Sequence, residues 1–155
     1  MIRNEKASIN HIAQISELEK QLFGNTAWSE ETIEAEITGD HRSYWVLLDN
    51  SDMVIGYAGV LLLAGDADIQ TIAVSATHQG FGYGRDLLKQ LLYEARKKNT
   101  KNVFLEVRAD NQAAIQLYEN EGFKNIGVRK GYYQPDGVDA IIMQLDLAKQ
   151  AKEIE

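Results

Sequence analysis

The chain has 155 residues, of which 45% are hydrophobic and 25% are charged, and this composition is typical of one folded domain. It contains no cysteine, which excludes a disulfide scaffold, a cysteine nucleophile and a thiolate metal site. The net charge of −7 argues against nucleic acid as the main partner.

The first third of the chain predicts two helices and a hairpin. Ser8 can cap a helix whose isoleucines and leucines recur at helical spacing up to Leu22, and Ser29 can cap a second helix that begins with acidic residues. Two strands should follow, Ser43–Leu48 and Met53–Leu63, and the polar residues between them are typical of a tight turn.

Two features of the same region bear on location. The N-terminus lacks the apolar stretch of a signal peptide. The longest apolar run, Met53–Ala64, has 12 residues and is too short to span a bilayer. We therefore expect a cytoplasmic protein that does not bind membranes.

The rest of the chain alternates strands and helices. The expected elements are a strand Ala67–Val74, a helix Gly82–Lys98, a strand Asn102–Val107, a helix capped by Asp110 or Asn111 that stops at Gly122, and strands near Phe123–Arg129 and Ala140–Leu145. The order ααβββαβαββ predicts an α/β fold, a mixed central sheet with helices on both faces. We assign residues 1–147 to one domain and 148–155 to a C-terminal tail of frayed helix.

A glycine-rich turn joins the strand Ala67–Val74 to the helix that follows. Glycines at alternate positions, Gly80, Gly82 and Gly84, allow close approach of a ligand to the backbone. The unpaired amides and the dipole at the start of the helix favour an anion, and Arg85 can add a charge-assisted bond. These features predict a pyrophosphate site, although a turn without a ligand remains an alternative.

Known phosphate-binding motifs narrow the possible ligand. No lysine follows the glycines as a P-loop requires, and Arg85 replaces the third glycine of a dinucleotide-binding motif. The turn instead matches Gln/Arg-x-x-Gly-x-Gly/Ala through Gln79, Gly82 and Gly84. This motif resembles the one that binds coenzyme A in the GNAT superfamily of N-acetyltransferases.

The segment Leu105–Phe123 carries a more specific resemblance. It contains Leu-Glu-Val-Arg, an asparagine, Leu-Tyr and Gly-Phe at the spacing typical of RimI-type ribosomal-protein-alanine N-acetyltransferases, a group within the GNAT superfamily. Trp28-Ser-Glu, Ile72-Ala-Val, Gly131-Tyr-Tyr and Asp139-Ala-Ile-Ile-Met resemble further segments, so the similarity extends from about residue 7 to 147. Departures include Ala27 in place of a proline, Gln70-Thr71 in place of an asparagine, and Gly80 at a position that is often basic.

The resemblance implies acetyl-CoA as co-substrate and gives roles to individual residues. For the cofactor it implies the backbone of Ile72, Ala73 and Val74 on the pantetheine arm, the turn Gln79, Gly80, Phe81, Gly82, Tyr83, Gly84 and Arg85 on the pyrophosphate, and the side chains of Asn111 and Tyr118. For the peptide substrate it implies Trp28, Tyr132 and Tyr133. Each also has a simpler interpretation: Asn111 as a helix cap, and the apolar and aromatic residues as packing.

Two residues are candidates for the chemistry. Glu106, between Leu105 and Val107 in a strand expected to be buried, is the candidate base, because desolvation would make its carboxylate more basic. A structural ion pair with Arg108 is the alternative. Tyr118 is the candidate acid that supports the leaving thiolate. His11, His41 and His78 are dispersed, and we expect no metal.

The function implied is transfer of an acetyl group to a protein N-terminus, above all the N-terminal alanine of a small-subunit ribosomal protein. The transfer would be direct, in a ternary complex. A GNAT enzyme acting on lysine side chains, polyamines or other amines is an alternative, and so is a non-catalytic acyl-CoA-binding module. The sequence does not define the oligomeric state.

Overall fold

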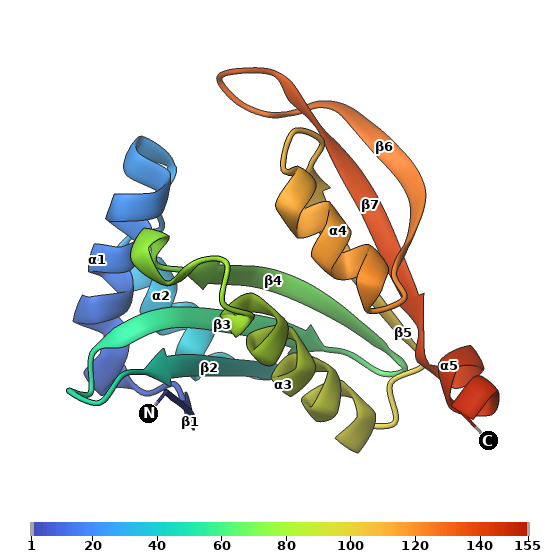
Figure 1. Ribbon diagram of the computed structural model, residues 1–155, viewed down its shortest axis with the longest axis horizontal. Coiled ribbons are helices and arrows are strands. Elements are labelled where there is room, and N and C mark those ends of the chain that lie inside the picture. The colour runs from blue at the N-terminus through green and yellow to red at the C-terminus, as the bar shows by residue number, and fades with distance from the viewer. Residues whose placement is uncertain (1, 155) are drawn as a thin grey trace. The chain divides into compact units, whose positions relative to one another are not determined.

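The computed structural model describes residues 2–154, which form one mixed α/β fold (Figure 1). Its seven-stranded sheet has the order β1-β2-β3-β4-β5-β7-β6. The elements are β1 (Arg3–Lys6), α1 (Ile12–Phe23), α2 (Glu30–Thr38), β2 (Arg42–Leu48), β3 (Val54–Leu62), β4 (Asp66–Val74), α3 (Tyr83–Lys97), β5 (Asn102–Arg108), α4 (Gln112–Asn120), β6 (Lys124–Tyr133), β7 (Val138–Asp146) and α5 (Leu147–Ile154).

The chain divides into two compact units. Unit 1 comprises Met1–Leu62 and Gln70–Glu94, and unit 2 comprises Leu63–Ile69 and Ala95–Glu155. Strand β4 contributes its last residues to unit 1 and its first to unit 2, where it pairs in parallel with β5 from Asp66 to Asp68. The predicted order of elements is confirmed, and the structure adds β1 before it. Helix α5, Leu147–Ile154, covers most of the tail that was predicted to be helix.

In unit 1, helices pack against both faces of the strands, and the alternating side chains of β2 contact a helix on each face. Val46 and Leu48 pack with Ile15 and Leu18 of α1 in a buried cluster. Leu47, between them, points to the other face and lies near Leu87 of α3. Each such side chain contributes roughly 1.5–3 kcal/mol when fully buried.

The two predicted helix caps of unit 1 differ in outcome. Ser29 caps α2, because its hydroxyl accepts the backbone N–H of Thr32 at 3.1 Å. Ser8 instead precedes a 3₁₀ turn, Ile9–His11, and its N–H donates to the Nδ1 of His11 at 3.0 Å. Helix α1 therefore begins at Ile12, later than the sequence pattern predicts.

In unit 2 the strands β5, β7 and β6 form an antiparallel sheet. Val103, Leu105 and Val107 of β5 are buried and share one face. The other face carries Glu106 and Arg108. In the register, Ala140 of β7 is the partner of both Arg108 and Arg129, so the side chains of these two arginines lie on the same face.

The hairpin β6–β7 is longer than predicted. Strand β6 continues to Tyr133 and β7 begins at Val138, whereas the sequence pattern placed the ends near Arg129 and Ala140. A register shift between Arg129 and Tyr133 carries the strand past its glycine. The added residues bring Tyr132 and Tyr133 onto the strand rather than onto a loop.

Candidate active site

The glycine-rich turn of unit 1 has the backbone that its sequence predicts. After β4 a short 3₁₀ turn, Ala76–His78, leads to Gly80 and Gly82, whose φ angles are +88° and +87°. A Cβ at either glycine would meet no other atom within 4 Å, so the conformation, and not crowding, calls for glycine. Gly84 lies within the first turn of α3.

Side chains of the turn hold it in place. The amide of Gln79 donates to the carbonyl of Val74 at 2.9 Å, across the turn to the end of β4. The hydroxyl of Ser75 lies 2.6 Å from Nδ1 of His78. Gln79 was predicted to contact the cofactor, and in the structure its side chain bonds to the protein itself.

The open side of this turn fits a pyrophosphate. The amides at the start of an α-helix have no acceptors inside the helix, and here they follow two glycines with open space beside them. Arg85 is in the first turn of α3, and Phe81 is 72% exposed. The backbone N–H groups and the open space beside Gly80 and Gly82 therefore suit an anion such as a phosphate.

The other predicted residues of unit 1 are more deeply placed. Ala73 is buried in the cluster beneath α1, whereas Ile72 and Val74, which alternation places on the other face of β4, are half-buried. The Trp28 side chain packs against the same cluster, and the backbone N–H of Trp28 donates to the carboxylate of Glu19 at 2.8 Å. Core packing is thus one role of the Trp28 side chain, and its contact with a peptide stays a prediction.

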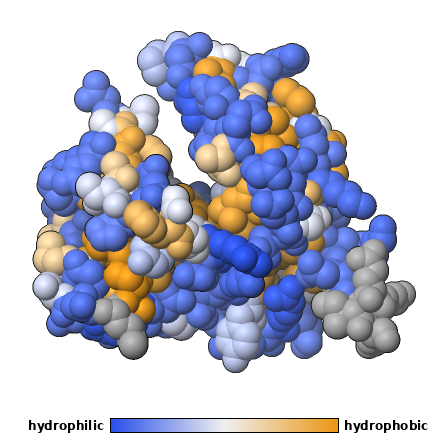
Figure 2. All heavy atoms as spheres, in the orientation of Figure 1, coloured by the Kyte–Doolittle hydropathy of each residue, from blue (hydrophilic) through white to orange (hydrophobic). Residues whose placement is uncertain are grey.

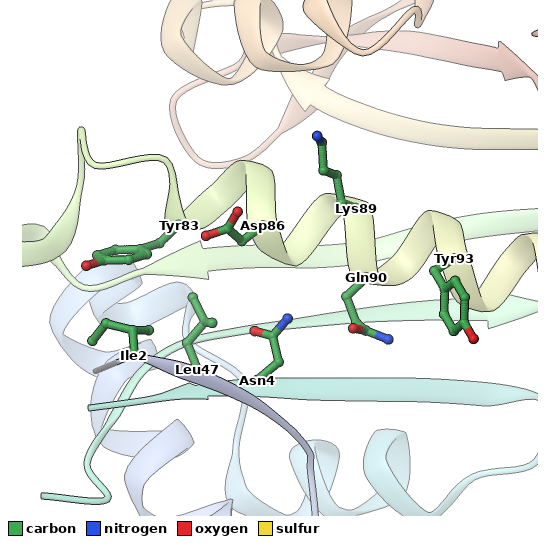
Figure 3. Close-up of a pocket in the computed structure, with 8 residues that line it drawn as sticks. All are labelled: Ile2, Asn4, Leu47, Tyr83, Asp86, Lys89, Gln90 and Tyr93. Carbon is green, nitrogen blue, oxygen red and sulfur yellow. The ribbon is translucent and has the colours of Figure 1, made fainter. Parts of the chain in front are cut away.

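Unit 1 also has a groove that the sequence did not suggest (Figure 3). It has a volume of about 380 Å³ and lies between α3 on one side and β1 and β2 on the other. Its lining residues are Ile2, Asn4, Leu47, Tyr83, Asp86, Lys89, Gln90 and Tyr93. Tyr83 is the one predicted cofactor residue among them. Four of the lining residues, Tyr83, Asp86, Gln90 and Tyr93, recur at helical spacing and so lie on one face of α3. This spacing is the one signal in the sequence that could have indicated the groove.

In unit 2 the candidate base Glu106 lies on an accessible face of β5. Its side chain is 32% exposed, and its Oε2 lies 3.6 Å from Nε of Arg129. The expected burial was wrong, because alternation places Glu106 opposite the buried Leu105 and Val107. An accessible carboxylate can be reached by a substrate.

The alternative pairing of Glu106 with Arg108 was also wrong. Arg108 donates to Asp110 at 3.1 Å and to Asp136 at 2.6 Å. These hydrogen bonds raise the pKa of Arg108 and, on the other side, lower the pKa of Asp136. The guanidinium also lies 5.2 Å from the centre of the Tyr133 ring. Arg108 therefore connects the end of β5 to the tip of the β6–β7 hairpin.

The candidate acid Tyr118 is the buried residue of α4, with 8% of its surface exposed. Its ring packs edge-on against Phe123, with the centroids 5.8 Å apart. Burial, with a smaller effect from Tyr133, raises the pKa of Tyr118 to about 12. The hydroxyl therefore stays protonated at neutral pH and is available as a hydrogen-bond donor.

Tyr133 connects the candidate residues of unit 2. Burial raises its pKa, and the charge of Glu106 and the neighbouring Tyr132 raise it further. Tyr133 also raises the pKa of Tyr118, so it lies within electrostatic range of both the candidate base and the candidate acid. Tyr132 packs edge-on against Tyr133 at 5.1 Å and is 48% exposed. In Figure 2, hydrophobic patches show among hydrophilic residues in the part of the surface formed by α4 and this hairpin.

Asn111 is a helix cap, as predicted. Its Oδ1 accepts the backbone N–H of Ala114 at 3.1 Å and so satisfies one of the free amides at the start of α4. Asn111 is the cap and Asp110 is not, since Asp110 pairs with Arg108. This hydrogen bond neither requires nor prevents a contact of Asn111 with the cofactor, which remains a prediction.

Two further observations concern other classes of function. Among residues 2–154 no group of three or more His, Cys, Asp or Glu is placed to hold a metal ion. In the same part of the chain, each helix is too short or too polar to cross a membrane.

Comparison with known proteins defines the class. The model of the acetyltransferase (GNAT) family matches residues 10–123, and the chain therefore belongs to this family. It is an N-acetyltransferase that depends on acetyl-CoA, as the resemblance implied.

Individual relatives give a finer placement. N-alpha-acetyltransferase RimI of Mycobacterium tuberculosis is 39% identical over 136 residues, which are 84% of this chain and 84% of that protein. The crystal structure of the ribosomal-protein-S18-alanine N-acetyltransferase from Escherichia coli matches with a TM-score of 0.85 and 32% identity, over 94% of each chain. These similarities confirm the predicted RimI-type resemblance.

A more distant structure supports the fold. Arabidopsis thaliana NAA60 in complex with acetyl-CoA has a TM-score of 0.85 at 17% identity, covering 96% of this chain and 99% of the other. At this identity the likeness concerns the fold. The predicted α/β sheet with helices on both faces is therefore confirmed from both near and distant relatives.

Proposed function

We propose that this enzyme acetylates the N-terminal α-amine of a protein, and that its main substrate is the N-terminal alanine of ribosomal protein bS18. The observation that carries the proposal is in unit 2, where an accessible carboxylate, Glu106, and a protonated tyrosine, Tyr118, both lie within electrostatic range of Tyr133. Relatives named for alanine N-acetylation of this ribosomal protein support the choice of substrate.

The proposal gives the two units different tasks. In unit 1, the backbone of Gly80–Gly84 and the side chain of Arg85 bind the pyrophosphate of acetyl-CoA, and the backbone of Ile72–Val74 binds its pantetheine arm. In unit 2, Glu106 and Tyr118 act on the reacting groups. Asn111 is assigned a cofactor contact in addition to its cap, and Trp28, Tyr132 and Tyr133 are assigned to the peptide.

The reaction needs a neutral amine and a stable leaving group. Acetyl-CoA supplies the acetyl group as a thioester. The nitrogen of the neutral amine forms a bond to the acetyl carbonyl carbon, and the carboxylate of Glu106 takes the proton that this nitrogen then loses, directly or through water. The C–S bond breaks, and its electron pair leaves with the sulfur as a thiolate.

Tyr118 is better suited to donate a hydrogen bond than to give up its proton. Burial raises its pKa to about 12, whereas an ordinary thiol has a pKa of about 8.5. Full transfer from the tyrosine to the thiolate would therefore be uphill. A hydrogen bond to a developing anion instead contributes about 1.5–3 kcal/mol.

The acceptor is inferred from pKa values and charge. An α-amine has a pKa of about 8 and a lysine about 10.4, so a weak base deprotonates the α-amine more readily. The net charge of −7 also favours a basic peptide over an acidic one. A lysine or polyamine acceptor is the second candidate within the same chemistry.

The experiment is acetylation of a panel of N-terminal hexapeptides, including one that begins with the alanine of the ribosomal protein, with mass spectrometry to locate the acetyl group. Acetylation of the α-amine is expected, fastest on the alanine peptide. Modification at internal lysines alone would contradict the α-amine proposal. Binding of acetyl-CoA without turnover on any amine would indicate a non-catalytic module.

A further inference from the structure

The carboxylate of Glu106 has a cation beside it that the proposed chemistry does not use. Nε of Arg129, on β6, lies 3.6 Å from Oε2 of Glu106, on β5. This is an ion pair but longer than a direct hydrogen bond. The Arg129 side chain is 57% exposed, so solvent and substrate can reach it.

The sheet explains how Arg129 reaches across a strand. Strand β7 lies between β5 and β6, and the register places Ala140 of β7 beside Arg129. In the neighbouring row, Gly127 of β6 is paired with Ile142, and Ile142 with Glu106. The small side chain of Ala140 leaves room for the arginine to lie over the sheet toward the carboxylate, while Ile142 fills the space beside Gly127.

A second contact fixes the direction of this side chain. The guanidinium of Arg129 lies 5.7 Å from the centre of the Tyr132 ring, at a distance typical of a cation–π interaction. The other arginine on this face, Arg108, is bonded to Asp110 and Asp136. Arg129 is thus the arginine directed at Glu106, held from the other side by an aromatic residue.

We propose that Arg129 is a specificity-determining residue, which places a fixed positive charge beside the acceptor amine and thereby favours an α-amine over a lysine side chain. The inference rests on the proposed function, since it requires the amine to meet Glu106. An amine that approaches the carboxylate also approaches the guanidinium. The guanidinium offsets the attraction of the Glu106 carboxylate for an ammonium, and so favours binding of the amine in its neutral, nucleophilic form.

The effect differs between the two kinds of amine. An α-amine with a pKa of about 8 is largely neutral a little above neutral pH, whereas a lysine with a pKa of about 10.4 must lose far more free energy to bind without its proton. The charged and titratable groups around this carboxylate include Arg129, Arg108 with its partners Asp110 and Asp136, Tyr118, Tyr132 and Tyr133, and Lys124 farther along the same face. Among them Arg129 is the cation that pairs with Glu106.

The test compares two peptides on the full-length enzyme. One begins with a free alanine and contains no lysine, and the other has a blocked N-terminus and one lysine. Values of kcat and KM are measured separately for both across pH 6–10 for wild type, Arg129→Gln and Arg129→Lys. The control is Lys130→Gln, which removes one positive charge from the next residue, whose side chain is 86% exposed and pairs with Asp139.

For Arg129→Gln we expect the preference for the α-amine in KM to fall by about tenfold, as one nearby charge is removed. The rise of kcat with pH on the alanine peptide should move to higher pH, a change that a merely structural role would not produce. Arg129→Lys should restore most of the preference because it keeps the charge. Lys130→Gln should behave as wild type.

The outcomes separate the two proposals. If wild type acetylates the alanine peptide and Arg129→Gln leaves both the preference and the pH profile unchanged, the inference about Arg129 is wrong while the proposed function stands. If wild type modifies only the lysine, the proposed function fails first and the inference with it. Should Arg129→Gln be unstable, Arg129→Lys alone must keep the preference, and its loss there would contradict a role of charge.

Discussion

The glycine turn of unit 1 and the strand–helix segment of unit 2 approach function in opposite ways. In the turn, the main chain forms the candidate site, since Gly80 and Gly82 have positive φ angles and the side chain of Gln79 bonds back to the protein. In unit 2 the side chains carry the candidate site, from Glu106 and Tyr118 to Tyr132 and Tyr133. Substitutions should therefore affect binding in the first region and turnover in the second.

The largest effect is expected for Glu106→Gln. Loss of a general base typically lowers the rate by about 10²–10⁴-fold. The variant should bind acetyl-CoA with an unchanged Kd, because the carboxylate lies in unit 2 and the proposed pyrophosphate site in unit 1. Single-turnover kinetics and calorimetry measure the two quantities. Full activity of Glu106→Gln would contradict the assignment of turnover to the side chains of unit 2.

A smaller effect on turnover is expected for Tyr118→Phe. Loss of one hydrogen bond to a developing anion should lower kcat by about 10–100-fold and change the Kd of acetyl-CoA much less. A variant that binds acetyl-CoA poorly but turns over normally would place Tyr118 with the binding residues instead.

The same variant has a signature at alkaline pH. Burial raises the pKa of Tyr118 from an ordinary value of about 10 to about 12. The folded state therefore holds this proton more tightly than the unfolded state, and stability present below pH ~10 is lost as the pH rises toward 12. Denaturant unfolding at about pH 9 and 11.5 should show a loss in wild type, and that loss should be about 2 kcal/mol smaller in Tyr118→Phe.

In the turn, Gly82→Ala should weaken cofactor binding while leaving kcat close to wild type. A non-glycine residue at this φ costs about 1–2 kcal/mol, which corresponds to a roughly tenfold higher Kd if the turn relaxes to avoid it. Gly84→Ala is the matched control, since Gly84 lies within α3, and its Kd should change less than about twofold. Equal effects of both substitutions would show that the φ angle of Gly82 is not what matters.

The smallest effect is expected at Asn111, where substitutions separate a role in stability from a role in cofactor binding. Asn111→Ala should cost about 1 kcal/mol of stability because α4 loses its cap, and Asn111→Asp should restore it. Urea unfolding gives the stability, and titration with acetyl-CoA shows whether the amide also touches the cofactor. A change in Kd in Asn111→Asp at full stability would support that second role.

The sequence predicted local structure correctly where the residue type itself determines the backbone conformation or a hydrogen bond to the neighbouring backbone. Glycine spacing predicted the positive φ angles of the turn, and Ser29 and Asn111 were correctly placed as caps. Strand β1 was missed because Arg3–Lys6 has no apolar side chain and is held by backbone pairing with β2. Such a strand leaves no hydrophobic pattern to read.

At the candidate site the failures have a similar origin. Glu106 was expected to be buried because its neighbours are apolar, although alternation along a strand turns it to the opposite face. The pairing of Glu106 with Arg129, and of Arg108 with Asp136, joins residues more than twenty positions apart. Local sequence cannot indicate such partners, because they depend on the register of three strands.

The bond from Gln79 to Val74 has a consequence for the thermodynamics of binding. A loop that is already closed by its own side chain loses little conformational entropy when a ligand arrives. The turn is in this sense preorganised, and association should be limited by encounter more than by loop rearrangement. The energy of the phosphate contacts would then appear almost entirely as affinity.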